Sequence, residues 1–452
     1  MYHPAVVDAR LSQILASPIG GAFKSQYGTS PAPIPAEECH RRTRQLATLW
    51  DAKKGAPSRR LTEEEQRFVT NERILTKVDY RYFAERYSCI VHPAKGLTPI
   101  FPLFTSQQLI LDAIGREEHA RRKIGHPDGL LFNILKGRQL GASTLCQSIL
   151  AHRVMTQTYT KGLIASDVPQ NSGSTGLFGM LELTVEHCPW WLKPNEQYHT
   201  KDHHIVFTNH STVVVESGKS MKGALQDDGG SKGQIGRSKT YSVAHLTELS
   251  TWENAGQIDD ALMPAIPMTP RTFMAKESTA KGRHNWWHKE WLTTQAGNGR
   301  SFNIFIPWYA ERSKYWAPCP TGWVPPDDVI AYAARVAQHG PRWMGGETYR
   351  LSKEQLYWYH LQRRAAEDKD ALYKFLEEYP AEPEEAFQYS GRSIFTPAQI
   401  DYLRNRQRPA RLLYRVLPNT LIADLRDHQL SPRDLEEELA MPAHAADAEE
   451  MV

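Results

Sequence analysis

The chain has few cysteines, and their placement excludes two kinds of cysteine-built structure. Its 452 residues include five cysteines, none of them in a CxxC pair. Neither a disulfide framework nor a zinc site is indicated, and reduced thiols in a cytoplasm are the simple interpretation. The 18 histidines show no ligand spacing either, which argues against a structural metal.

Long apolar runs and a strong charge imbalance are also missing. No window reaches the roughly 18 apolar residues of a membrane span. The first twenty residues lack the charged start and apolar run of a signal peptide. With a net charge of +3, any basic surface for nucleic acid must be local. A content of 40% hydrophobic and 23% charged residues is ordinary for a globular protein of several domains.

What the sequence does contain is an alternation of strand-like and helical stretches. Apolar runs typical of strands cover 130–135, 162–166, 204–209, 211–217, 241–246 and 272–277. This rhythm predicts an α/β fold, in which a mostly parallel central sheet is flanked by helices.

Helices and loops are expected around this core. We predict a helix over 61–78, another opened by a capping box from Thr105 to Gln108, and a helical region over 325–390. The Gly/Pro/Ser-rich residues 17–35 are interpreted as linker or loop.

Residues 136–144, KGRQLGAST, lie between a strand-like run and a helix, as a phosphate-binding loop does. The usual lysine is missing, because Ala142 occupies its place. Gly141 permits close backbone approach, Ser143 or Thr144 offers a hydroxyl for Mg²⁺, and Lys136 or Arg138 could supply the charge. An ordinary strand–turn–helix junction with exposed basic residues is the alternative.

Two further strand-like runs end in acidic residues. In LTELSTW the strand ends at Thr247–Glu248, where a glutamate could polarise an attacking water; a solvated charge is the alternative. The run that ends in ESTAKG carries Glu277, Ser278 and Thr279. Its hydroxyls could sense a γ-phosphate or merely cap the following helix.

The order of these motifs resembles the large terminase subunit of tailed bacteriophages, the ATPase that drives DNA into the capsid. The resemblance covers about 79–395 and implies a P-loop NTPase fold that uses ATP and Mg²⁺. It implies that Lys136 is a displaced phosphate lysine, Arg138 a γ-phosphate contact with a catalytic role, and Ser143 a Mg²⁺ ligand. The nucleotide-binding loop would also include Gly141, Ala142 and Thr144.

Other motifs of the resemblance give further roles. Gln107, in FPLFTSQQLIL, matches the adenine-contacting Q motif. Glu248 matches the Walker B glutamate. Thr247 stands where many members carry Asp, so that Mg²⁺ coordination would pass through water or rest on the P-loop serine. ESTAKG is similar to the coupling motif, which gives Glu277, Ser278 and Thr279 that role. FIPWY (305–309) and 377–395 resemble stretches common in one branch of the family.

The resemblance also predicts the domains and the partners. We expect a largely helical N-terminal extension (1–98), a P-loop ATPase core (99–320), a helical linker or lid (321–395) and a tail with an acidic end (396–452). Expected partners are double-stranded DNA, a portal protein and a small terminase subunit, with a homo-oligomeric ring on the portal. The expected location is the cytoplasm of the infected host cell, with no membrane partner.

The tail departs from the family, which usually continues into an RNase H-like nuclease with clustered aspartates. Residues 396–452 are too short for a domain of roughly 100 residues. The spacing of Asp424 and Asp427 suits a helix better than a nuclease strand. We therefore predict that this chain does not cut DNA, and that the nuclease is on a separate chain or lost.

Any DNA sequence must pass through a packaging motor, so contacts should go to phosphates. One candidate surface is the Gly/Ser/Lys-rich loop 218–240, with a solvated loop as the alternative. Another is 281–291, where Trp287 and Trp291 belong either to the core or to an aromatic–basic surface. Arg237 is also a candidate arginine finger. The DNA-binding candidates in the loop are Lys219, Lys222, Lys232, Arg237 and Lys239.

Two rival functions remain at this point. One is a helicase-like P-loop NTPase that remodels nucleic acid. The other is a degenerate P-loop scaffold that holds DNA or proteins without turnover, which Ala142 and Thr247 favour.

Overall fold

The computed structural model describes residues 2–92, 94–100, 102–200, 204–217, 240–283, 285–339 and 349–387. The chain divides into two units, Met1–Ser390 and Gly391–Val452, and every described residue belongs to the first. The predicted tail, with Asp424 and Asp427, lies outside the described residues.

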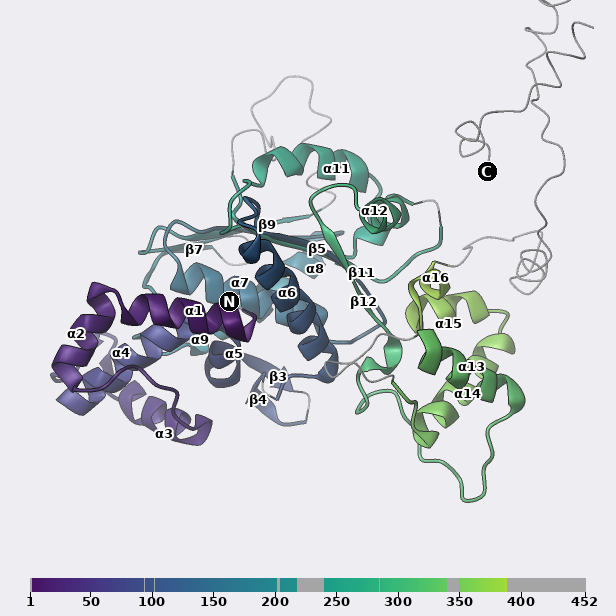
Figure 1. Ribbon diagram of the computed structural model, residues 1–452, viewed down its shortest axis with the longest axis horizontal. Coiled ribbons are helices and arrows are strands. Elements are labelled where there is room, and N and C mark those ends of the chain that lie inside the picture. The colour runs from purple at the N-terminus through teal and green to yellow at the C-terminus, as the bar shows by residue number, and fades with distance from the viewer. Residues whose placement is uncertain are drawn as a thin grey trace, which may run out of the picture. The chain divides into compact units, whose positions relative to one another are not determined.

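An eight-stranded sheet forms the centre of the first unit (Figure 1). Its order is β12-β5-β11-β10-β6-β9-β8-β7, and the strands from β12 to β9 run parallel. The strands are β5 (Leu130–Lys136), β6 (Lys161–Ser166), β7 (Glu196–Thr200), β8 (His204–Phe207), β9 (Thr212–Ser217), β10 (Val243–Thr247), β11 (Phe273–Ser278) and β12 (Phe302–Ile306). All six predicted strands are present, and the mostly parallel α/β fold is confirmed.

One end of the sheet is antiparallel. Strand β8 pairs antiparallel with both β7 and β9. Residues 208–211 alone join β8 to β9. A parallel pair needs a crossover of a dozen or more residues, so this short connection can only form a hairpin.

Helices cover both faces of the sheet (Figure 1). Along β5, Phe132 and Ile134 enter one hydrophobic cluster, whereas Leu131 and Leu135 enter another. This alternation follows from the two-residue period of a strand, and burial on both faces explains why β5 is apolar. The helices that follow or flank these strands are α6 (Thr105–Lys123), α7 (Ala142–Thr156), α8 (Pro169–Ser172), α9 (Leu177–His187), η1 (Leu249–Thr251), α11 (Ala255–Leu262), η2 (Met263–Ala265), α12 (Trp286–Gln295) and η3 (Trp308–Ala310).

The N-terminal segment is largely helical and packs into the same core. Tyr2 is 2% exposed, and its ring centroid lies 5.7 Å from that of Tyr80 and 5.9 Å from that of Phe273 in β11. The elements are α1 (Pro4–Leu15), α2 (Pro18–Tyr27), α3 (Ala36–Ala47), α4 (Glu63–Val78), α5 (Tyr80–Tyr87) and two hairpins, β1 (Trp50–Asp51) with β2 (Ala56–Pro57) and β3 (Cys89–His92) with β4 (Gly96–Pro99).

The interpretation of residues 17–35 as linker or loop is wrong for its first half, which forms α2. Pro18 occupies a first-turn position, where its missing N–H costs nothing, and Gly28 ends the helix at φ 69°. Within α2, a Cβ on Gly20 would lie 2.5 Å from the Cα of Leu15. Proline and glycine therefore mark the ends and the close packing of a helix, rather than a flexible linker.

The predicted start of α6 is correct, but its capping box is displaced by one residue. The N-cap is Phe104, and its N–H donates to Gln107 Oε1 at 2.9 Å. Thr105 is already the first helical residue, so Gln107 makes the contact that was expected of Gln108.

The C-terminal part of the first unit is helical, as predicted, and is built on aromatic stacking. Tyr332 and Tyr359 stack with ring centroids 3.8 Å apart, and Trp308 Nε1 donates to the Tyr332 hydroxyl at 2.8 Å. Among the described residues, no helix combines the length and the apolar character needed to cross a membrane. The helices are α13 (Asp327–His339), α14 (Lys353–Glu367), α15 (Leu372–Glu378) and α16 (Pro383–Ala386).

Candidate nucleotide site

The carboxyl ends of three neighbouring strands meet at one edge of the sheet. Strand β5 ends at Lys136, β10 at Thr247 and β11 at Ser278. In the register, Thr247 pairs with Glu277 and Leu135 pairs with Ser278. Ligands of open α/β sheets bind at this edge.

The loop from β5 to α7 is braced from below by α6. Gly141 has φ 76°, and a Cβ there would lie 2.9 Å from Gln107 Nε2, so glycine is required. Gln107 Nε2 donates to Gly141 O at 3.0 Å, and Ser106 Oγ donates to Leu140 O at 2.7 Å. The Gln107 amide thus holds the loop, and contact with adenine stays a prediction.

The first turn of α7 offers backbone donors to an anion. No side chain caps this helix, and the N–H groups of Ala142, Ser143 and Thr144 have no acceptor within it. With the helix dipole, they form an anion site. Ala142 is buried, whereas Ser143 and Thr144 are partly exposed.

A buried ion pair occupies the floor of the site. Lys136 Nζ lies 3.7 Å from Glu277 Oε2, and the side chains are 7% and 0% exposed. Burial alone would lower the pKa of Lys136, but the carboxylates of Glu277 and Glu248 raise it above its ordinary value. The lysine therefore remains charged where Ala142 cannot supply a cation.

Glu277 is held ionised by several partners. Burial would raise its pKa, but Lys136, His245 and the Ser143 hydroxyl lower it to about 2. Its Oε1 accepts from Thr247 Oγ1 at 2.8 Å and lies 3.2 Å from His245 Nε2. Gln147 Nε2 lies 2.6 Å from His245 Nδ1; a donating amide there leaves the imidazole proton on Nε2, facing Glu277.

The other oxygen of Glu277 has no hydrogen-bond partner among the described residues, although it is fully buried. Buried carboxylate oxygens are normally satisfied, so an orphan of this kind marks a place for a cation or water. The hydroxyls of Ser143 and Thr247 adjoin the same carboxylate. Carboxylate and hydroxyl oxygens suit Mg²⁺, so this set fits the expected metal.

Glu277 thereby supplies the acid that position 247 lacks. Sequence reasoning placed Glu277 in a coupling motif and missed both this role and His245. Strand periodicity carried a usable signal, because His245 and Thr247 lie two apart on one face of β10 and both contact Glu277.

Glu248 lies just beyond β10 in a left-handed conformation, with φ 57°. Burial raises the pKa of its carboxyl group, and Lys136 partly opposes this shift. The following turn is fixed, because Ser250 N donates to Ser278 Oγ at 3.1 Å. Non-glycine residues in this conformation are costly and cluster at functional sites. Thr279, the next predicted coupling residue, is half-buried.

Arg138 is exposed and forms an ion pair with Glu378 of α15, at 2.8 Å from Nη1 to Oε1. Its backbone N–H donates to Glu378 O at 2.9 Å, and the Tyr315 hydroxyl donates to Arg138 O. A contact from Arg138 to a γ-phosphate, which stays a prediction, would require this ion pair to open.

The neighbouring glutamate of α15 contacts the predicted coupling segment. Gly282 N donates to Glu377 Oε1, and burial raises the pKa of Glu377 to about 7. Consecutive residues of α15 thus contact both the loop after β5 and the segment after β11.

A Glu377→Gln variant is expected to be more stable than the wild-type protein at pH 8, by about 1–2 kcal/mol, and nearly equal to it at pH 5. The folded-state pKa of Glu377 is raised, so its neutral form stabilises the fold, and this contribution is lost as pH rises through about 7. Urea unfolding at both pH values measures the difference. The exposed Glu384→Gln is the matched control, and equal pH dependence in both variants would contradict the assignment.

Two predictions about a DNA surface have different outcomes. The side chains of Trp287 and Trp291 are 0% and 4% exposed, which confirms the core interpretation and makes an aromatic surface there wrong. The five cations of the 218–240 loop (Lys219, Lys222, Lys232, Arg237 and Lys239) lie outside the described residues.

The structure is similar to large terminase structures from several bacteriophages. The large terminase of bacteriophage HK97 matches with a TM-score of 0.38 and 14% identity, over 64% of this chain and 52% of that chain. The large terminase ATPase domain of Thermus phage P74-26 matches with a TM-score of 0.34 and 14% identity, over 59% and 92%. The large terminase of another, thermophilic bacteriophage gives 0.34 and 11%, over 56% and 54%.

This chain thus matches about half the length of the HK97 protein and of the last of these proteins. No family model matches the sequence, and a search of curated proteins gives no match. Since these TM-scores and identities are low, the function is argued from the geometry of the site.

Proposed function

We propose that this chain is an ATPase that drives double-stranded DNA into a viral capsid, as a large terminase subunit does. The observation that carries the ATPase proposal is the meeting of Lys136, Glu248 and Glu277 beside the uncapped start of α7. The order of motifs in the sequence supports the link to DNA packaging.

In this proposal the phosphates of ATP bind the N–H groups of 142–144 and the ammonium of Lys136. Ser143, Thr247 and Glu277 would hold Mg²⁺, which when bound neutralises charge that builds on the phosphates. Glu248 orients and polarises the attacking water. Arg138 would exchange Glu378 for the γ-phosphate, and Gln107 would brace the loop below the adenine side.

The coupling to DNA belongs to the same proposal. Ser278 and Thr279 follow β11 directly, and Glu377 ties α15 to Gly282 in the same segment. A change at the phosphates would therefore reach the helical residues 327–387 along two short paths. The proposed partners are a portal protein, a small terminase subunit and further copies of this chain in a ring, in the host cytoplasm, with any nuclease on a separate chain.

Phosphate release with and without double-stranded DNA tests the proposal. We expect Mg²⁺-dependent release that DNA stimulates and that Lys136→Ala abolishes. No release under either condition would leave the scaffold alternative, which the pairing of Lys136 and Arg138 with glutamates favours. Strand displacement on a forked duplex, without any need for a portal and an empty capsid shell, would favour the helicase-like alternative.

A further inference from the structure

A second basic site lies at the opposite edge of the sheet. A cavity of about 360 Å³ opens beside the first residue of β5, Leu130, whereas Lys136 ends that strand. Seven residues of strand place the two sites about 20 Å apart. Six cationic side chains line the cavity: Arg10, Lys77, Arg121, Arg122, Arg153 and Arg271.

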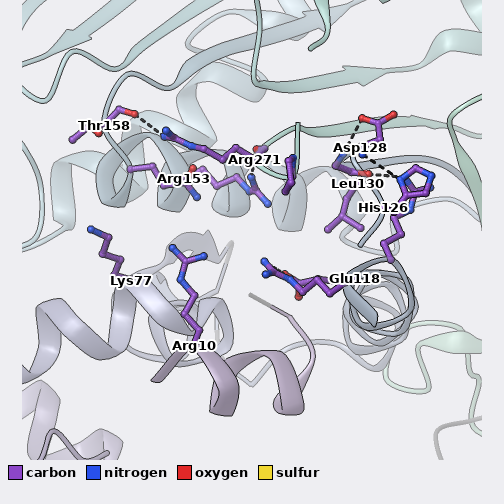
Figure 2. Close-up of a pocket in the computed structure, with 14 residues that line it drawn as sticks. Arg10, Lys77, Glu118, His126, Asp128, Leu130, Arg153, Thr158 and Arg271 are labelled. Carbon is purple, nitrogen blue, oxygen red and sulfur yellow. Dashed lines mark hydrogen bonds and ion pairs between the residues drawn. The ribbon is translucent and has the colours of Figure 1, made fainter. Parts of the chain in front are cut away.

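These cations come from separate elements and face one another. Figure 2 shows Arg10 and Lys77 rising from the N-terminal helices α1 and α4 toward Arg153 and Arg271 on the opposite wall. Burial and the guanidinium groups of Arg122, Arg153 and Arg271 lower the pKa of Arg10. The fold therefore holds like charges together at a cost.

The carboxylates of the cavity do not balance this charge. Only Glu118 and Asp128 line it, against six cations, which leaves an excess of four positive charges. Asp128 is already engaged by Arg300, at 2.6 Å. Glu118 accepts from Tyr2 N at 2.8 Å and lies 3.4 Å from Arg122.

Helix ends account for part of the excess. The cavity adjoins the C-terminal turns of α4, α6 and α7, which carry Lys77, Arg122 and Arg153. Each helix end has about half a negative charge, so three ends offset roughly 1.5 of the four. More than two positive charges still lack compensation.

Some of the cations are oriented by neutral acceptors, which leave their charge available. Arg153 is 7% exposed and donates to Arg271 O at 2.8 Å, while Arg271 donates to Thr158 O at 2.7 Å. Neither Arg10 nor Lys77 forms a hydrogen bond or ion pair with any other residue in the described part of the chain. Two guanidinium groups are thus positioned, and two more cations face them without a partner.

We propose that this cavity binds a small oligophosphate anion, either free or as the phosphate chain of a nucleotide. Arginines in a recess are the usual receptors for phosphate, and the volume lies within the range of small-molecule sites. A DNA duplex carries its phosphates on a convex surface and would not reach a guanidinium as deep as that of Arg153. The site is distinct from the P-loop, and its existence does not depend on the proposed ATPase.

Calorimetric titration with inorganic triphosphate tests the site, with EDTA present and in a Lys136→Ala background that removes P-loop binding. Arg10→Ala/Lys77→Ala should lower the affinity by roughly tenfold or more, because two charged contacts are lost. The matched control, Arg44→Ala/Lys53→Ala, removes two exposed cations elsewhere and should bind like its parent. Neither substitution in the test pair removes a described hydrogen bond or ion pair, and thermal unfolding verifies the fold.

Further titrations distinguish the sources of the anion. Tighter binding of ATP than of triphosphate would identify a nucleotide, and equal binding a free oligophosphate. Equal triphosphate affinity in the test and control pairs would overturn the proposal. So would a loss of DNA-duplex affinity in the test pair with unchanged triphosphate affinity, since that result would make the cavity part of a DNA surface.

Discussion

A Glu248→Gln protein is expected to bind ATP like the wild-type protein and to release phosphate at least about 100-fold more slowly. The amide keeps the size of the carboxyl group but cannot accept a proton from water. The turn that carries it is fixed by Ser250 and Ser278, independently of the substituted side chain. Loss of turnover without loss of binding is therefore the specific signature of this residue.

Single-turnover phosphate release and a nucleotide-binding titration measure the two quantities separately. The matched control is Glu186→Gln, which removes an exposed carboxylate from α9. It should hydrolyse ATP at the wild-type rate. Unchanged turnover in Glu248→Gln would exclude the proposed mechanism, and loss of ATP binding would show that Glu248 acts on the substrate's ground state.

The pH dependence of turnover gives a second readout for Glu248. Burial raises the pKa of its carboxyl group above the ordinary value. Only the ionised form accepts a proton, so the rate should rise with pH to a plateau, with a midpoint above that of an ordinary glutamate. The residual rate of Glu248→Gln should lack this rise.

The sheet and its functional edge could be predicted because their signals are local. Runs such as 130–135 and 272–277 are apolar and flanked by turns, so they identify strands without knowledge of the fold. The carboxyl ends of parallel strands share one edge, so Lys136 and Glu248 were expected to approach each other. Their mutual effect on pKa in the structure agrees with that expectation.

Other features depend on register and on contacts between distant residues. The pairing of Thr247 with Glu277 follows from how β10 and β11 align, which no local pattern specifies. The ion pair between Arg138 and Glu378 joins residues far apart in the sequence. The basic cavity likewise collects Arg10, Arg153 and Arg271 from three separate segments, each unremarkable alone.

Glu277→Gln is expected to lower the free energy of unfolding by about 3 kcal/mol at pH 7, because it leaves Lys136 buried without its closest counter-charge. It should also abolish Mg²⁺-dependent phosphate release, since the acid beside Ser143 and Thr247 is lost. The folded-state pKa of Glu277 is depressed to about 2. The stability that it contributes is therefore present above about pH 4.5 and is lost as pH falls toward 2.

A double-mutant cycle with Lys136→Met separates structure from catalysis. Removing both charges should recover much of the stability lost in Glu277→Gln, since neither charge is then left unpaired. It should not recover phosphate release, because the lysine and the acid are both needed at the phosphates. If the double variant is as unstable as the sum of the two single variants, the buried pair is not coupled. If it hydrolyses ATP at the wild-type rate, the catalytic edge lies elsewhere in the chain.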